Sequence, residues 1–158
     1  MSNGRGYLAP FTAALMLWSS APAHAADLAG AASTAELGRR YSEALSRQDT
    51  TAYALLVCWD RVLPQDRKSM ESGLAMQAGN ATGDFRYLTL AQLDQEIEQT
   101  GGMAPARKPV TRAGVTYDFN LPVIGYLVYG GSDGRGFGAV PVGMKEGRYY
   151  LITRAPLP

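Results

Sequence analysis

The stretch VTYDFNLPVIGYLVYG (residues 115–130) decides the fold of this chain. Apolar and polar side chains alternate over residues 115–121, which is the period of a strand with one buried face. Pro122 interrupts this pattern, and residues 123–130 continue as a strand with apolar side chains on both faces. A strand of the second kind has to be covered on both sides.

The segments that follow predict further strands. Residues 131–136 (GSDGRG) have the composition of a turn, and residues 145–147 (KEG) form a second, tighter one. Residues 137–142 and 148–153 have strand character. The glycine-rich turn lacks the order of a phosphate-binding loop and no helix follows it, so we expect no nucleotide cofactor there. Strands joined by short turns predict an antiparallel meander.

Upstream of the strands the pattern is helical. Leu37, Tyr41 and Leu45 recur every four residues, which indicates an amphipathic helix that begins near Thr34. A second helix is expected from residue 50 through about Val62, because its apolar side chains cover most of the helix circumference until Pro64 stops it.

Two further helices are expected, over residues 65–78 and 90–100. Thr89 and Gln92 have the spacing of a capping box at the start of the second of them. Residues 85–88 fit either a short strand or a packed loop. Helices that come first and strands that come last are typical of an α+β domain, in which the helices pack on the antiparallel sheet. We assign residues 35–158 to this single domain.

The N-terminus has the layout of a cleavable secretory signal. Arg5 precedes the apolar run of residues 8–18, and Ala23-His24-Ala25 matches a cleavage site, so we expect cleavage after Ala25 and a flexible lead-in over residues 26–34. The apolar run is too short for a stable membrane anchor, and no cysteine lies at the cleavage boundary to accept a lipid. The sequence therefore predicts a periplasmic or secreted protein of bacterial type.

Composition excludes several classes of function. The chain has 15 basic and 14 acidic side chains, and one of the basic ones lies in the signal. A balanced charge argues against a nucleic-acid binder. The only histidine, His24, leaves with the signal, which removes catalytic triads, histidine-ligated zinc and an imidazole base. The only cysteine, Cys58, has apolar neighbours, and we expect it to be buried rather than reactive. We expect no metal and no cofactor.

Asp118 is the one candidate for chemistry, and it lies mid-strand on the side opposite Tyr117. If that side lines a pocket, Asp118 can act as a base, with Tyr126 or Tyr129 from the next strand as hydrogen-bond donors. If that side faces water, Asp118 is an ordinary strand residue.

The three tyrosines are also the candidate binding residues. Tyr117, Tyr126 and Tyr129 lie on strands whose second apolar face needs a cover. That cover can be a protein partner, an apolar small molecule, a second copy of the chain as a homo-oligomer, or the sheet itself if it curls.

The first helices resemble those of the nuclear-transport-factor-2-like, or cystatin-like, superfamily. Tyr41, Ala44-Leu45, Asp49, Ala52 and Leu55 or Leu56 occupy the places of that family's opening pattern, and GRYYLITRAP (147–156) is similar to its last strands. The resemblance implies a curved sheet wrapped around a helix. It also implies a non-catalytic binding or assembly module, or an enzyme of the ketosteroid isomerase kind that uses pocket acids and tyrosines. The helix over 90–100 departs from the family pattern.

The sequence favours an exported, non-catalytic module of the cell envelope that binds a ligand or a protein. The alternative is an acid/base enzyme that uses Asp118 and the tyrosines in a sheet pocket.

Overall fold

The computed structural model describes residues 29–74, 85–130 and 137–158. In these ranges the helices are α1 (Thr34–Arg47), α2 (Thr50–Leu56), α3 (Pro64–Ser72) and α5 (Leu90–Thr100). The strands are β1 (Arg86–Thr89), β2 (Val110–Arg112), β3 (Val115–Phe119), β4 (Gly125–Gly130), β5 (Phe137–Lys145), β6 (Arg148–Leu151) and β7 (Arg154–Pro156). The predicted signal, residues 75–78 of the predicted third helix and the turn over 131–136 lie outside the described residues, and α3 itself ends at Ser72 rather than continuing to 78.

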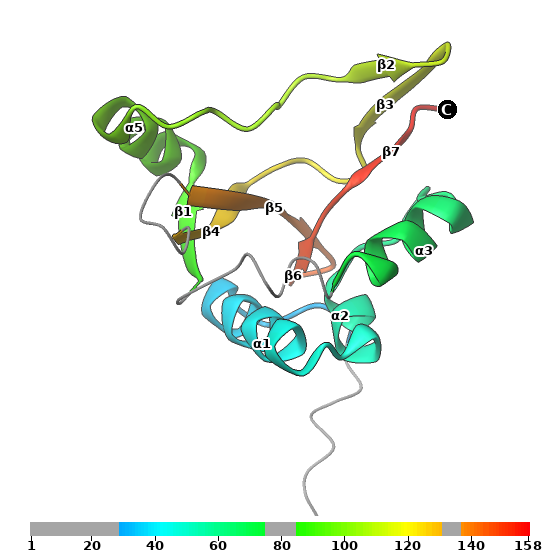
Figure 1. Cartoon of the computed structure of the whole chain (residues 1–158), viewed down its shortest axis with the longest axis horizontal. Coiled ribbons are helices and arrows are strands. Elements are labelled where there is room, and N and C mark those ends of the chain that lie inside the picture. The colour runs from blue at the N-terminus through cyan, green and yellow to red at the C-terminus, as the bar shows by residue number, and fades with distance from the viewer. Residues whose placement is uncertain (1–28, 75–84, 131–136) are drawn as a thin grey trace, which may run out of the picture.

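The α+β class is confirmed, with α1, α2 and α3 before the strands and α5 between β1 and β2 (Figure 1). The strands form two antiparallel sheets rather than one meander. One has the order β1-β4-β5-β6 and the other β2-β3-β7. The chain leaves the first sheet after β6, and β7 then pairs with β3, with Asp118 opposite Ala155.

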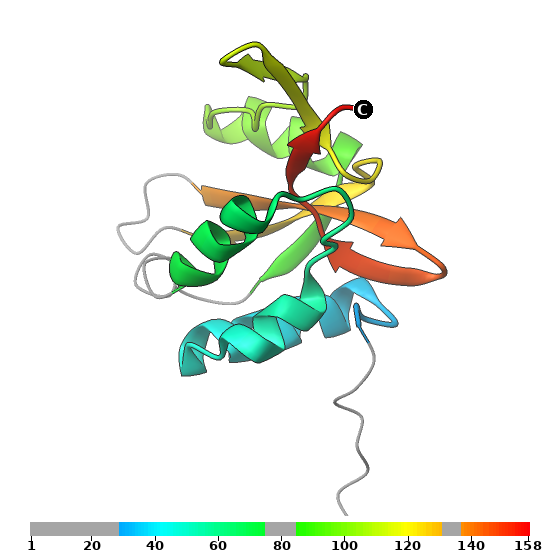
Figure 2. The ribbon, with the colours of Figure 1, turned by 90° about the vertical axis from the view of Figure 1, so that its right-hand side faces the viewer.

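The four-stranded sheet is covered on both faces by helices of the same chain. Figure 2 shows α1 and α2 on one side of it and α5 on the other. Leu127 belongs to the core under α1 and α2, whereas Tyr126 and Val128 pack with Leu93 of α5. The second apolar face of β4, for which the sequence left several covers open, is therefore buried by α5.

Asn120 joins the two sheets at the point where the chain crosses between them. Its backbone N–H donates to the Thr153 carbonyl at 2.9 Å, and its side-chain oxygen accepts from the Thr153 N–H at 3.3 Å. Its side-chain amide donates to the carbonyls of Cys58 at 2.6 Å and Asp60 at 3.3 Å. A buried amide with all these partners is a structural residue.

The prediction of a second helix through Val62 is wrong, because α2 ends at Leu56. The backbone beyond it finds partners outside the helix: Val57 bridges to Leu151, and the Cys58 N–H donates to the Leu151 carbonyl at 2.9 Å. The Trp59 indole N–H donates to the Ala54 carbonyl at 2.8 Å, which satisfies a group that the helix end leaves open.

The predicted starts of two helices, near Thr34 and at residue 90, are confirmed. The Ser33 hydroxyl accepts from the Glu36 N–H at the start of α1, and the capping box of Thr89 and Gln92 is present at α5. Cys58 is 4% exposed, so its predicted burial is confirmed, and burial raises the pKa of its thiol.

Residues 29–33, from the predicted lead-in, are held against the domain. The Ala31 N–H and carbonyl both bond to Tyr149 of β6 at 2.9 Å. The Gly30 carbonyl accepts from Arg40 at 2.6 Å and from Arg148 at 3.1 Å. The segment thus adds one short pairing to the edge of β6.

Candidate functional site

A cavity of about 330 Å³ lies between the helices and the four-stranded sheet, and tyrosines form part of its wall. Tyr41 comes from α1, Tyr53 from α2 and Tyr129 from β4. The other described residues that line it are Met70, Phe119, Ala139, Val140, Pro141, Ile152, Thr153 and Arg154. We call this space the tyrosine cavity.

Aromatic packing fixes the shape of this wall. The Tyr41 ring lies 4.8 Å from the Phe85 ring and 6.1 Å from the Tyr53 ring, measured between centroids. Phe85 in turn lies 5.1 Å from Tyr129. The Tyr129 ring rests on Gly138, where a Cβ would overlap it, so glycine at this position lets the ring lie flat across β5. These contacts hold the rings as a preformed surface.

Burial sets the electrostatics of the tyrosine cavity. Burial, and secondarily the neighbouring Tyr53 and Tyr129, hold the pKa of the Tyr41 hydroxyl far above its ordinary value. Burial, with the nearby Glu71 carboxylate, raises the pKa of Tyr53 to about 12. Both hydroxyls are therefore neutral at physiological pH and can give or accept hydrogen bonds but cannot serve as bases.

A second opening of about 320 Å³ adjoins the tyrosine cavity and shares Met70, Thr153 and Arg154 with it. The remaining described residues around it are Asp66, Ser69, Val110, Arg112 and Tyr117. It lies between α3 and the β2-β3 hairpin. We call it the arginine mouth, because Arg112 and Arg154 both line it. The tyrosine cavity and the arginine mouth together are called the joint space.

The three predicted binding tyrosines are not brought together. Tyr129 lines the tyrosine cavity and Tyr117 lines the arginine mouth. Tyr126 is 1% exposed beneath α5, where its hydroxyl is buried without a hydrogen-bond partner among the described residues. Its ring lies under the Arg107 guanidinium, at 5.9 Å from the centroid.

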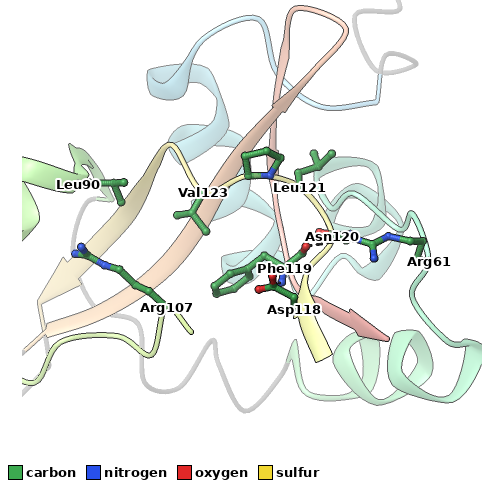
Figure 3. Close-up of a pocket in the computed structure, with 9 residues that line it drawn as sticks. Arg61, Leu90, Arg107, Asp118, Phe119, Asn120, Leu121 and Val123 are labelled. Atoms are coloured by element: carbon green, nitrogen blue, oxygen red, sulfur yellow. Dashed lines mark hydrogen bonds between the residues drawn. The ribbon is translucent and has the colours of Figure 1, made fainter. Parts of the chain in front are cut away.

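Asp118 lies in a separate pocket of about 450 Å³. Figure 3 shows Arg107 and Arg61 at opposite ends of it, with Phe119 and Asp118 between them. One carboxylate oxygen of Asp118 accepts from the Phe119 N–H at 2.8 Å. Arg61 donates to the Phe119 and Pro156 carbonyls, both at 3.3 Å, and Arg107 pairs with Asp94. The described wall of this pocket holds no tyrosine, so Asp118 and the tyrosine hydroxyls do not share a site.

Sequence reasoning did not single out Tyr41, Tyr53, Met70, Arg112 or Arg154 as site residues, although all five line the tyrosine cavity or the arginine mouth. Tyr41, Tyr53 and Met70 lie on helices, where an apolar side chain is expected to belong to the core. Such a pattern does not distinguish a filled core from one that borders a cavity. Arg154 follows the last predicted strand. The one available signal was a charged residue within an apolar C-terminal segment.

Among the described residues, no three histidine, cysteine, aspartate or glutamate side chains gather closely enough to hold a metal ion. In that same part of the chain, no helix has the length and apolar character needed to cross a bilayer. Comparison of the chain with protein-family models, curated proteins and solved structures found no match.

Proposed function

We propose that this protein is exported and binds a small, mostly apolar molecule in the tyrosine cavity without transforming it. The observation that carries the proposal is the cavity itself, about 330 Å³ of space walled by aromatic and aliphatic side chains from helices and strands. Sites for small molecules have volumes of roughly 300–1,000 Å³ and mainly apolar walls with a few polar groups.

The chemistry of the lining supports binding rather than catalysis. The described lining of the tyrosine cavity contains no aspartate or glutamate, and Arg154 is its one charged side chain. General base catalysis needs a group that is deprotonated at the working pH. The raised pKa values of Tyr41 and Tyr53 keep those hydroxyls protonated. The cavity therefore offers shape, hydrogen bonds and one cation, but no base.

Export is supported by the order of residues 1–25, with a basic residue, an apolar run and a cleavage site. Cleavage after Ala25 would keep the segment that docks on β6, since its first described residue is Ala29. The proposed protein is thus an envelope-located or secreted binding module.

The test uses the full chain, produced with its leader and collected from the extracytoplasmic fraction. Its mass should correspond to a start at Ala26. It is then titrated with N-phenylnaphthylamine, an uncharged probe that fluoresces in apolar sites. We expect saturable one-to-one binding. A chain that keeps Met1 and stays in the cytosol would contradict export, and unsaturable or absent probe binding would contradict the binding site.

Two variants locate the probe. Met70→Trp places a bulky indole ring where the tyrosine cavity meets the arginine mouth. Probe binding should therefore weaken by at least about tenfold, which is a loss of roughly 1.4 kcal/mol. Asp118→Asn is the matched control, because Asp118 lines the separate pocket. Cooperative urea unfolding of both variants verifies that they fold. Equal loss in the two variants would contradict this location.

A further inference from the structure

The charged groups of the joint space are gathered at one end. Arg112 and Arg154 both line the arginine mouth, with Asp66 as the one acidic residue of its described wall. The tyrosine cavity behind it has Arg154 alone. A molecule that fills both spaces therefore meets aromatic and aliphatic side chains at one end and cationic side chains at the other.

Arg154 is positioned but not neutralised. Its guanidinium stacks on the Phe119 ring, 4.5 Å from the centroid, and donates to the Ala106 carbonyl at 2.7 Å. A longer contact of 3.5 Å reaches the Tyr117 carbonyl. Neutral carbonyls orient an arginine but leave its charge uncompensated. Within the described ranges Arg154 forms no ion pair, and it is only half-buried, so it can still meet an anion from the mouth.

Arg112 adds a second cation without a partner. It is the last residue of β2, it is exposed, and it too forms no ion pair with a described residue. Asp66 forms no ion pair with Arg112 or Arg154 in the described ranges. Ser69 and Thr153 place hydroxyls on the same wall.

We propose that the ligand is an amphipathic anion, with an apolar or aromatic body in the tyrosine cavity and a carboxylate, sulfonate or phosphate group held by Arg154 and Arg112. This inference rests on the proposed binding function and specifies the chemistry of its ligand. Planar guanidinium groups form paired hydrogen bonds with such oxyanions. The shared residues Met70, Thr153 and Arg154 join the two halves of the site.

The test compares two probes that share one ring system and differ by one anionic group. N-phenylnaphthylamine is uncharged, and anilinonaphthalene sulfonate carries a sulfonate. We expect the sulfonate to bind about tenfold more tightly at low salt, the effect of one charge-assisted hydrogen bond. Added salt should reduce that advantage, whereas binding of the uncharged probe should stay the same.

Three variants test which arginines cause the tighter binding of the sulfonate probe. Arg112→Met and Arg154→Met should each remove most of the advantage of the sulfonate, measured as the ratio of the two probe affinities, because Arg154 also lines the tyrosine cavity and its variant can change both affinities. Arg39→Met is the control, since Arg39 is exposed on α1 and pairs with Glu43 outside both openings. The Arg112 side chain forms no hydrogen bond with another described residue, so its variant remains informative if Arg154→Met folds poorly.

The outcomes separate the two proposals. Failure of both probes to bind would contradict the binding function. Equal affinity for the two probes, or an equal loss in Arg39→Met, would contradict the anion preference and leave the apolar site standing. Loss confined to the two mouth variants supports the inference.

Discussion

At the scale of single residues, buried polar groups divide into structural and site-forming ones. Asn120 satisfies its side chain with Cys58, Asp60 and Thr153, and thereby locks the crossover between the sheets. Tyr41 and Tyr53 instead line an open space and are kept neutral by burial. Similar burial thus accompanies a structural role for Asn120 and a place in the wall of the tyrosine cavity for Tyr41 and Tyr53.

The buried tyrosines predict how stability depends on pH. Burial and then Glu71 raise the pKa of Tyr53 from 10.0 to about 12 in the folded protein, so the folded state retains the phenolic proton that the unfolded state releases. The free energy of unfolding should be insensitive to this group below pH 10, and should fall as the pH rises from 10 toward 12. Tyr41 should add to the same fall.

Urea unfolding across this alkaline range measures the effect. Tyr53→Phe removes one titrating group, so its stability should fall less steeply than that of the wild type. Glu71→Gln should lower the folded-state pKa of Tyr53 slightly and flatten the curve a little. Identical slopes for wild type and Tyr53→Phe would show that Tyr53 is not held neutral in the folded state.

At the scale of elements, the sequence predicted what local chemistry determines. The capping box at Thr89 predicted the start of α5, the four-residue spacing predicted the start of α1 near Thr34, and alternation found β3. It could not predict that α2 stops at Leu56, because the competing partners of that backbone, Leu151 and Asn120, are far away in the chain.

The same limit applies to the sheets and the site. The split between β6 and β7 depends on pairing with β3, which no local pattern encodes. Apolar residues on both faces of β4 predicted that both faces are buried, and α5 covers the second face. Asp118 was singled out by alternation alone, which gives the side of the strand but not which pocket that side borders.

The α3 helix is the least anchored wall of the site. None of its residues is fully buried, whereas α1 buries five. Its main described contacts are the Arg67 guanidinium over Trp59, at 4.8 Å from the ring centroid, and Met70 against the core. Elements with few buried contacts open locally at low free energy.

Hydrogen exchange should therefore be faster in α3 than in α1, and probe binding should slow it in α3 selectively. Mass spectrometry of peptides from both helices, with and without N-phenylnaphthylamine, measures this. The peptide over α1 residues distant from the cavity serves as the internal control. Equal protection of the two helices, or no change in α3 on binding, would contradict a role for α3 as a movable wall.

At the scale of the whole molecule, helices and strands border two adjoining openings, the tyrosine cavity and the arginine mouth, which share Met70, Thr153 and Arg154. The crossover at Asn120 joins the two sheets, and Met70 of α3 borders both the tyrosine cavity and the arginine mouth.

The most direct measurement of this account is a crystal structure of the processed protein with N-phenylnaphthylamine bound. We expect the probe between the Tyr129 ring and Met70, with Tyr41 and Tyr53 beside it and the Asp118 pocket empty. A probe seated beside Asp118, or on the outer surface while the tyrosine cavity stays closed, would contradict it.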